Sequence, residues 1–156
     1  MSVFKCVAMS DEDVERLRAA ETDDFANTIQ RIHNDETYPC RYTLREMSAR
    51  DGMLLLSYQL KRPKSVYSQP TAIFLTATGS ERFDEPDVVP EIVRNRMVSF
   101  RAFSDDGMMV YDANEIVEPK GDHIGAIHRI FSRPDVAFIN AHTAQAGCML
   151  AHLERT

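Results

Sequence analysis

The sequence contains three cysteines, and two of them stand near residues that would make a thiol reactive. Cys40 is followed by Arg41, and Arg45 lies four residues further on; a neighbouring guanidinium charge favours the nucleophilic thiolate. Cys148 follows His142 in the C-terminal segment, and a histidine that takes up the thiol proton can activate a cysteine nucleophile. Cys40, His142 and Cys148 are therefore the candidate catalytic residues, with inert buried thiols as the alternative.

Whether His142 faces Cys148 depends on the loop between two predicted strands, 136–143 and 148–154. A loop of four residues places His142 opposite Met149, whereas a loop of five residues places it opposite Cys148. The sequence leaves both registers open, because a shift of one residue moves a side chain to the other face of a strand.

Arg41 and Arg45 are the candidate ligand-binding residues. The net charge of the protein is −6, yet basic residues outnumber acidic ones between residues 38 and 70. Positions i and i+4 share a face in a helix and in a strand, so both guanidinium groups are expected to point the same way. Such groups grip a carboxylate or a phosphate. We expect a site for an acidic small molecule or an acidic partner surface, to which Lys61–Lys64 would contribute. The alternative is ion pairing with the acidic segment 81–91.

Motifs for a metal or a cofactor are missing from the sequence. It contains neither Gly-x-Gly-x-x-Gly nor a phosphate-binding loop, so a nucleotide cofactor has no support. His123 and His128 are five residues apart and therefore do not pair on one helix face. His152, near the C-terminus, is expected on the surface. We predict no cofactor and no metal site.

Charge and hydropathy bear on partners and location. A net charge of −6 disfavours binding to nucleic acid or to an anionic membrane. The chain has no apolar run of about 18 residues, the length that crosses a bilayer. Three widely spaced cysteines and no signal segment predict a cytoplasmic protein with free thiols. An exposed edge strand would permit a homo-oligomer.

The elements that would position the candidate residues predict a single α+β domain of 156 residues. The strands are expected at residues 3–9, 53–60, 71–78, 98–103, 108–112, 115–118, 136–143 and 148–154. The helices are expected at residues 11–20, 23–33, 89–94 and 122–132, the first two as separate helices or one bent helix. Most strands come as adjacent pairs with short loops, which favours a largely antiparallel sheet built from hairpins over βαβ repeats.

Several local signals support these boundaries. Ser10 resembles an N-cap, because three acidic residues follow it in the first helical turn. Asp51-Gly52 is typical of a tight turn, and the apolar run Met53–Leu60 indicates a strand buried on both faces. Pro63, within Lys61–Lys64, is expected to end that strand. Cys40–Met47 fits either a strand or a helical turn.

Four segments of the chain resemble, in order, those of an uncharacterised bacterial family, the DUF1203 proteins. The segments are "PCRYTLREMSARDGMLLLSYQL", "TAIFLTATGSERF", "FRAFSDDGMMVYDANEIVE" and "RPDVAFINAHTAQAGCMLAHLER", together with the opening "FKCVAM". The resemblance covers most of the chain from Tyr38 onward. It implies a shared fold and brings no activity with it.

The chain departs from the family pattern at positions that could bind a metal. The resemblance implies a second cysteine where Thr43 stands, and a histidine and a cysteine where Thr76 and Ser80 stand. Cys40 and Cys148 remain. Two thiols do not complete the four-ligand shell of a structural zinc, so this set is not expected to hold a metal in this chain.

Overall fold

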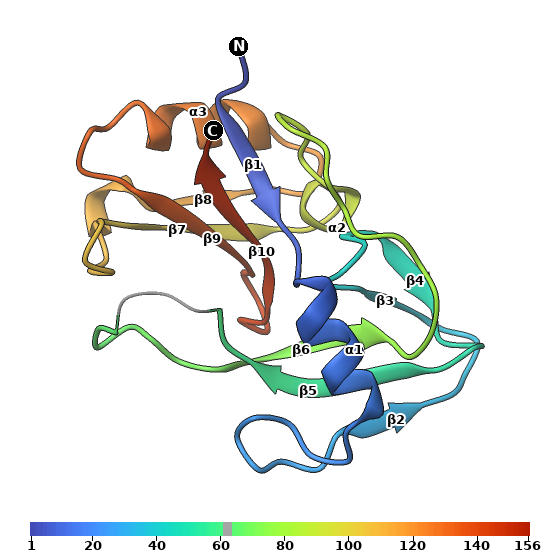
Figure 1. Ribbon diagram of the computed structural model, residues 1–156. Coiled ribbons are helices and arrows are strands. Elements are labelled where there is room, and N and C mark those ends of the chain that lie inside the picture. The colour runs from blue at the N-terminus through green and yellow to red at the C-terminus, as the bar shows by residue number, and fades with distance from the viewer. Residues whose placement is uncertain (61–63) are drawn as a thin grey trace.

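The computed structural model describes residues 1–60 and 64–156, and the strands in these ranges form three sheets (Figure 1). The largest sheet consists of β1 (Phe4–Val7), β7 (Val98–Phe103), β8 (Glu115–Val117), β9 (Phe138–Thr143) and β10 (Met149–Arg155). Their order is β1-β10-β9-β7-β8, and all neighbours are antiparallel. The N-terminal strand thus pairs with the C-terminal one.

A second sheet has the order β2-β5-β6, and β3 pairs with β4 in a small ribbon. These strands are β2 (Gln30–Ile32), β3 (Thr37–Pro39), β4 (Glu46–Ser48), β5 (Met53–Tyr58) and β6 (Thr71–Thr76). The helices in the described ranges are α1 (Asp11–Ala19), α2 (Glu91–Arg94), α3 (His123–Phe131) and the short 3-10 helix η1 (Tyr111–Ala113). The predicted α+β class with largely antiparallel sheets is confirmed.

One hydrophobic core lies between α3 and one face of the five-stranded sheet. Successive side chains of a strand point to opposite faces. This core takes Phe100 and Ala102 from β7, and Ile139 and Ala141 from β9. The α3 side chains in the same core are Ala126, Ile127, Ile130 and Phe131. The intervening residues of β7 and β9 therefore point to the face of the sheet away from α3.

A second core lies between α1 and the β5–β6 pair. Val14 and Leu17 of α1 pack there with Leu54 of β5 and Leu75 of β6. The helix begins as predicted, because the Ser10 hydroxyl accepts a hydrogen bond from the Asp13 amide at 3.1 Å. Figure 1 shows α1 crossing in front of the three-stranded sheet in the lower half of the view, whereas α3 lies at the top.

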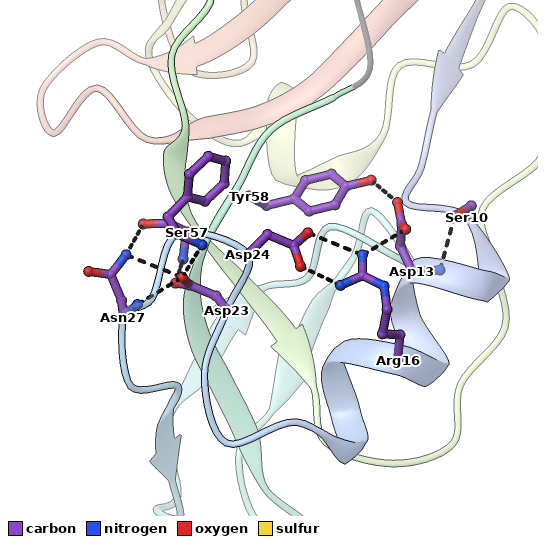
Figure 2. A network of polar contacts seen from close by, with 9 residues as sticks. Ser10, Asp13, Arg16, Asp23, Asp24, Asn27, Ser57 and Tyr58 are labelled. Atoms are coloured by element: carbon purple, nitrogen blue, oxygen red, sulfur yellow. Dashed lines mark hydrogen bonds and ion pairs between the residues drawn. The ribbon is translucent and has the colours of Figure 1, made fainter.

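The predicted helix 23–33 is wrong, because this segment is a loop that leads into β2. The Asp23 carboxylate accepts hydrogen bonds from the Phe25 and Asn27 amides at 2.9 and 3.1 Å. It also accepts one from the Ser57 amide of β5 at 2.9 Å (Figure 2). The Asp23 side chain thus accepts hydrogen bonds from backbone amides that would have carbonyl partners in a helix. Its bond to Ser57 also connects the loop to the second sheet.

Predictions for three other segments have different outcomes. Residues 108–112 form no strand, since only an isolated bridge from Met109 to Phe103 precedes η1. The predicted turn at Asp51-Gly52 is present, with Gly52 at φ +100°. The expected end of β5 at residues 61–63 lies outside the described residues.

Candidate functional site

A pocket of about 430 Å³ lies between the two larger sheets. One wall is the face of β7, β9 and β10 that points away from α3; the other is formed by described residues between the end of β5 and the start of β6, from the ranges 58–60 and 65–72. Figure 1 shows the tip of the β9–β10 hairpin next to β6, and β10 is in contact with β6. The pocket therefore lies where the second sheet approaches the polar face of the first.

Strand register brings Arg101, Asn140 and His142 to the same pocket wall. Arg101 of β7 is the direct cross-strand partner of Asn140 in β9, and His142 lies two residues beyond Asn140. Directly opposite Cβ atoms are about 5 Å apart, and residues i and i+2 share a face. All three side chains line the pocket. Arg101 and Asn140 were not predicted as site residues, although each is a polar residue between two buried apolar ones in its strand.

His142 is neutral near pH 7, and its hydrogen bond identifies the tautomer. Its Nδ1 lies 2.9 Å from the Gly147 carbonyl oxygen, which can only accept, so Nδ1 carries the proton. Burial of the ring lowers the pKa of His142 to about 4, and the charges of Arg101 and Arg41 act in the same direction. Within the described part of the chain Nε2 has no hydrogen-bond partner. Nε2 therefore carries a lone pair that can accept a hydrogen bond from a ligand in the pocket.

Asn140 is held by His152 on the neighbouring strand. His152 Nδ1 lies 2.7 Å from Asn140 Oδ1, and its Nε2 lies 3.4 Å from a carboxylate oxygen of Glu154. The predicted surface position of His152 is wrong, because the residue is fully buried. With Oδ1 of Asn140 engaged, its amide nitrogen is left to donate to a ligand.

Arg101 is a cation in this pocket that has no ionic partner among the described residues. No residue in the ranges 1–60 and 64–156 forms a hydrogen bond or an ion pair with its guanidinium group. Among the described residues that line the pocket there is also no aspartate or glutamate. A second polar atom of the wall, Thr71 Oγ1, is buried and has no hydrogen-bond partner among the described residues. Buried polar atoms in native proteins are normally bonded, and such exceptions mark places where a ligand or a water binds.

The structure places His142 and Cys148 in one pocket, and it places Cys40 elsewhere. The four-residue loop is the observed register, since His142 pairs with Met149. Cys148 is half-buried, but the described contacts include no hydrogen bond between its sulfur and His142. Cys40 is fully buried in the second core, with Sγ 3.8 Å from Thr76 Oγ1. A substrate in the pocket could therefore meet Cys148, whereas Cys40 has no access to it.

The predicted pairing of Arg41 and Arg45 on one face is wrong. Arg41 is 1% exposed, whereas the Arg45 side chain is 65% exposed and lies 3.8 Å from Glu85. The chain reverses between them, with Leu44 at φ +52° and its amide bonded to the Cys40 carbonyl. The two guanidinium groups are therefore separated, and the unpaired arginine at a pocket is Arg101 instead.

Arg41 is nevertheless unusual, because its buried guanidinium makes one hydrogen bond. Nη1 donates to the Leu150 carbonyl at 2.9 Å, while Nε and Nη2 have no partner among the described residues. Burial lowers the pKa of Arg41 to about 10, so the group is still charged at pH 7. A β10 irregularity between Met149 and Ala151 frees the Leu150 carbonyl from the strand ladder.

Thr76 and Ser80, two of the positions where the resemblance implies a metal-binding residue, lie side by side. Thr76 Oγ1 is 3.8 Å from Cys40 Sγ and 3.0 Å from Ser80 Oγ. Arg18 donates to Thr76 Oγ1 at 2.9 Å and to the Gly79 carbonyl at 2.9 Å. A guanidinium group therefore bonds the hydroxyl and carbonyl oxygens here. In the described ranges no group of three or more metal-ligating side chains comes together.

Comparison with known proteins places the chain in a family. Residues 37–155 match the family model described as "Protein of unknown function (DUF1203)". The chain belongs to the DUF1203 family. The DUF1203 region contains all the described residues that line the pocket, whereas β1, α1 and β2 lie before it. No curated protein and no solved structure matches the chain. None of the helices that the structure describes could cross a membrane.

Proposed function

We propose that this DUF1203 protein binds a small acidic molecule in the pocket between its two larger sheets, with Arg101 as the anchor. The observation that carries the proposal is the Arg101 guanidinium, which lines a pocket of about 430 Å³ and lacks an ionic partner among the described residues. A planar guanidinium binds a carboxylate with two parallel hydrogen bonds. The volume lies within the usual range of small-molecule sites.

The surroundings of Arg101 support an anion rather than a cation. The charges of Arg101 and Arg41 both lower the pKa of His142, so both guanidinium groups contribute positive potential at this wall. Arg41 cannot contact the ligand, because it is buried and does not line the pocket. The buried Arg41 charge strengthens attraction for an anion, since a partly desolvated site screens charges less than water does.

Thermal unfolding with a panel of carboxylic acids tests the proposal. A ligand at about 100 times its Kd adds about 2.7 kcal/mol to the free energy of unfolding. For a chain of this size that raises Tm by roughly 5–10 °C. We expect this shift for the wild-type protein and for Arg45→Gln, and its loss for Arg101→Gln. Arg45 is the matched control, because it is an exposed arginine outside the pocket. An equal shift in Arg101→Gln would contradict the proposal.

A cysteine enzyme is the second candidate, and the shared pocket of His142 and Cys148 favours it. A base must take up the thiol proton for the sulfur to attack, and Nε2 is the available atom of His142. Iodoacetamide labelling against pH separates the candidates. A Cys148 thiolate that depends on His142 reacts well below the ordinary pKa of about 8.5, and this reactivity is lost in His142→Gln. Labelling that follows an ordinary thiol removes the enzyme candidate.

A further inference from the structure

We infer that the ligand is a monoanionic hydroxy acid, whose carboxylate pairs with Arg101 and whose hydroxyl group donates a hydrogen bond to His142 Nε2. This inference rests on the proposed function and names the chemical class of the molecule that would fill the site. Three features of the pocket support it: the number of charges on its wall, the direction of its hydrogen bonds and the nature of its apolar side.

The charge of the pocket suits one negative charge. Arg101 is the only arginine, lysine, aspartate or glutamate among the described lining residues. A monoanion is neutralised by this one guanidinium. A dianion such as a phosphate monoester would bring a second charge that no described lining side chain balances, and an unbalanced charge in a partly desolvated site is costly. Among the described lining residues, the charge count therefore favours a carboxylate over a phosphate.

The hydrogen bonds of the wall require a ligand that both accepts and donates. Arg101 and the amide nitrogen of Asn140 are donors from opposed positions on β7 and β9, and together they suit one carboxylate. His142 Nε2, two residues from Asn140, can only accept while the ring is neutral. The ligand must therefore bring a hydrogen to this nitrogen. A hydroxyl group does so without charge, whereas an ammonium group would be repelled by Arg101 and Arg41.

The remaining wall is aromatic. Phe103 of β7 and Phe138 of β9 are stacked, with ring centroids 5.0 Å apart and an angle of 13° between the rings. Tyr67 from the opposite wall meets Phe103 edge-on at 6.1 Å. All three line the pocket and offer apolar surface to a flat side group. The expected ligand thus has an aromatic or branched apolar group beside its hydroxyl and carboxylate.

Isothermal titration with a matched series of acids tests the inference on the wild-type protein. The probes are phenyllactate, phenylpropionate, which lacks the hydroxyl, phenylalanine, which has an ammonium in its place, and phenylethyl phosphate. We expect phenyllactate to bind about tenfold more tightly than phenylpropionate, because the deoxy acid leaves Nε2 without a partner. Phenylalanine and the phosphate are expected to bind more weakly than phenyllactate.

Two variants assign these effects to residues. Arg101→Gln is expected to lose affinity for every acid in the series. His142→Phe is expected to bind phenyllactate and phenylpropionate equally, and His142→Gln, which keeps an acceptor, to restore part of the preference. Circular dichroism confirms that each variant is folded, and the wild-type series decides the question if one is not.

The outcomes separate the two levels of the proposal. If the acids bind through Arg101 but the hydroxyl brings no gain, or if the phosphate binds most tightly, the inference is overturned and the proposed function stands. If none of the carboxylates binds at any concentration, the proposed function fails and the inference fails with it. A hydroxyl preference that survives in His142→Phe also overturns the role of His142.

Discussion

His142 donates its single ring proton to a backbone carbonyl, and this hydrogen bond determines what the pocket can bind. With Nδ1 on the Gly147 oxygen, Nε2 is left as an acceptor beside the Arg101 guanidinium. Protonation of Nε2 would place a second positive charge near Arg101. The charge would also be buried, because His142 is only 5% exposed. The positive charge of Arg101 therefore helps to keep the His142 ring neutral.

The low pKa of His142 predicts how stability depends on pH. The pKa falls from 6.5 to about 4 on folding, so between these values the unfolded chain takes up a proton that the folded protein does not. His142 makes its full contribution to the free energy of unfolding above pH 6.5, and this contribution decreases as the pH falls towards 4. The loss reaches about 3 kcal/mol for a shift of this size.

Urea unfolding between pH 7 and pH 4.5 measures this effect. The wild-type protein is expected to lose more stability over the range than His142→Gln, which has no group that titrates there. Carboxylates with lowered pKa values, such as Asp23, contribute equally to both proteins and cancel in the comparison. Parallel pH profiles for the two proteins would show that His142 is not held neutral by the fold.

At the residue scale, the sequence identified some members of the site and missed the central one. His142 and Cys148 were found because a histidine and a thiol in one predicted hairpin suggest chemistry, and they do share the pocket. Arg101 was missed because its position depends on the pairing of β7 with β9, two strands that are separated in the chain by η1, β8 and α3. Arg41 and Arg45 share a face only in a regular helix or strand, and the turn at Leu44 is neither.

At the scale of elements, the well-predicted segments are those whose signals are local. The Ser10 cap, the Asp51-Gly52 turn and the apolar run of β5 lie within a few residues of the structure they produce. The loop after α1 is different, because its decisive contact joins Asp23 to the Ser57 amide, which is distant in sequence. The helical spacing of apolar residues in 23–33 predicted a helix because this contact is not visible locally.

Asp23→Ala tests whether that carboxylate holds the loop. The change leaves the amides of Phe25, Asn27 and Ser57 without their acceptor, and each buried unpaired group costs about 1–3 kcal/mol. We expect urea unfolding to show a total loss of about 2–4 kcal/mol. Asp24→Ala is the neighbouring control. Asp24 is half exposed and pairs with Arg16 (Figure 2), so its removal is expected to cost less than about 1 kcal/mol.

Equal losses in the two alanine variants would contradict this account of the loop. They would mean that the Asp23 hydrogen bonds add no more to stability than an exposed ion pair does. A loss confined to Asp23→Ala would explain why β2 forms where the sequence pattern predicted a helix, since the loop would then be fixed by its side chain rather than by its apolar residues.

At the scale of the whole molecule, Arg41 connects the two larger sheets. Its amide donates to the Phe74 carbonyl of β6 at 2.9 Å, and its side chain donates to the Leu150 carbonyl of β10. Its carbonyl accepts from the Met9 amide, which follows β1. The neighbouring thiol of Cys6 has a pKa raised by burial to about 12, so it supplies no negative charge at pH 7. Arg41 thus packs between the two cores, and none of the described residues supplies a negative charge that pairs with its guanidinium group.

Two substitutions separate the packing of Arg41 from its charge. Arg41→Ala removes most of the side chain and is expected to cost about 3–5 kcal/mol through the cavity that it leaves. Arg41→Met keeps an apolar stem and removes a buried charge, so the free energy of unfolding is expected to stay within about 1 kcal/mol of the wild type. Chemical denaturation gives both values. A loss in Arg41→Met as large as in Arg41→Ala would mean that the charge itself stabilises the fold.

An NMR titration of the wild-type protein with phenylpropionate, followed through assigned backbone and side-chain signals, tests whether Arg101 anchors an acidic ligand in the pocket. We expect saturable shifts at the Arg101 guanidinium, the Asn140 amide and the His142 ring, with Arg45 unchanged. Shifts that are confined to Arg45 and its partner Glu85, or the absence of saturable shifts at Arg101, would contradict the claim that an unpaired arginine in this pocket anchors an acidic ligand.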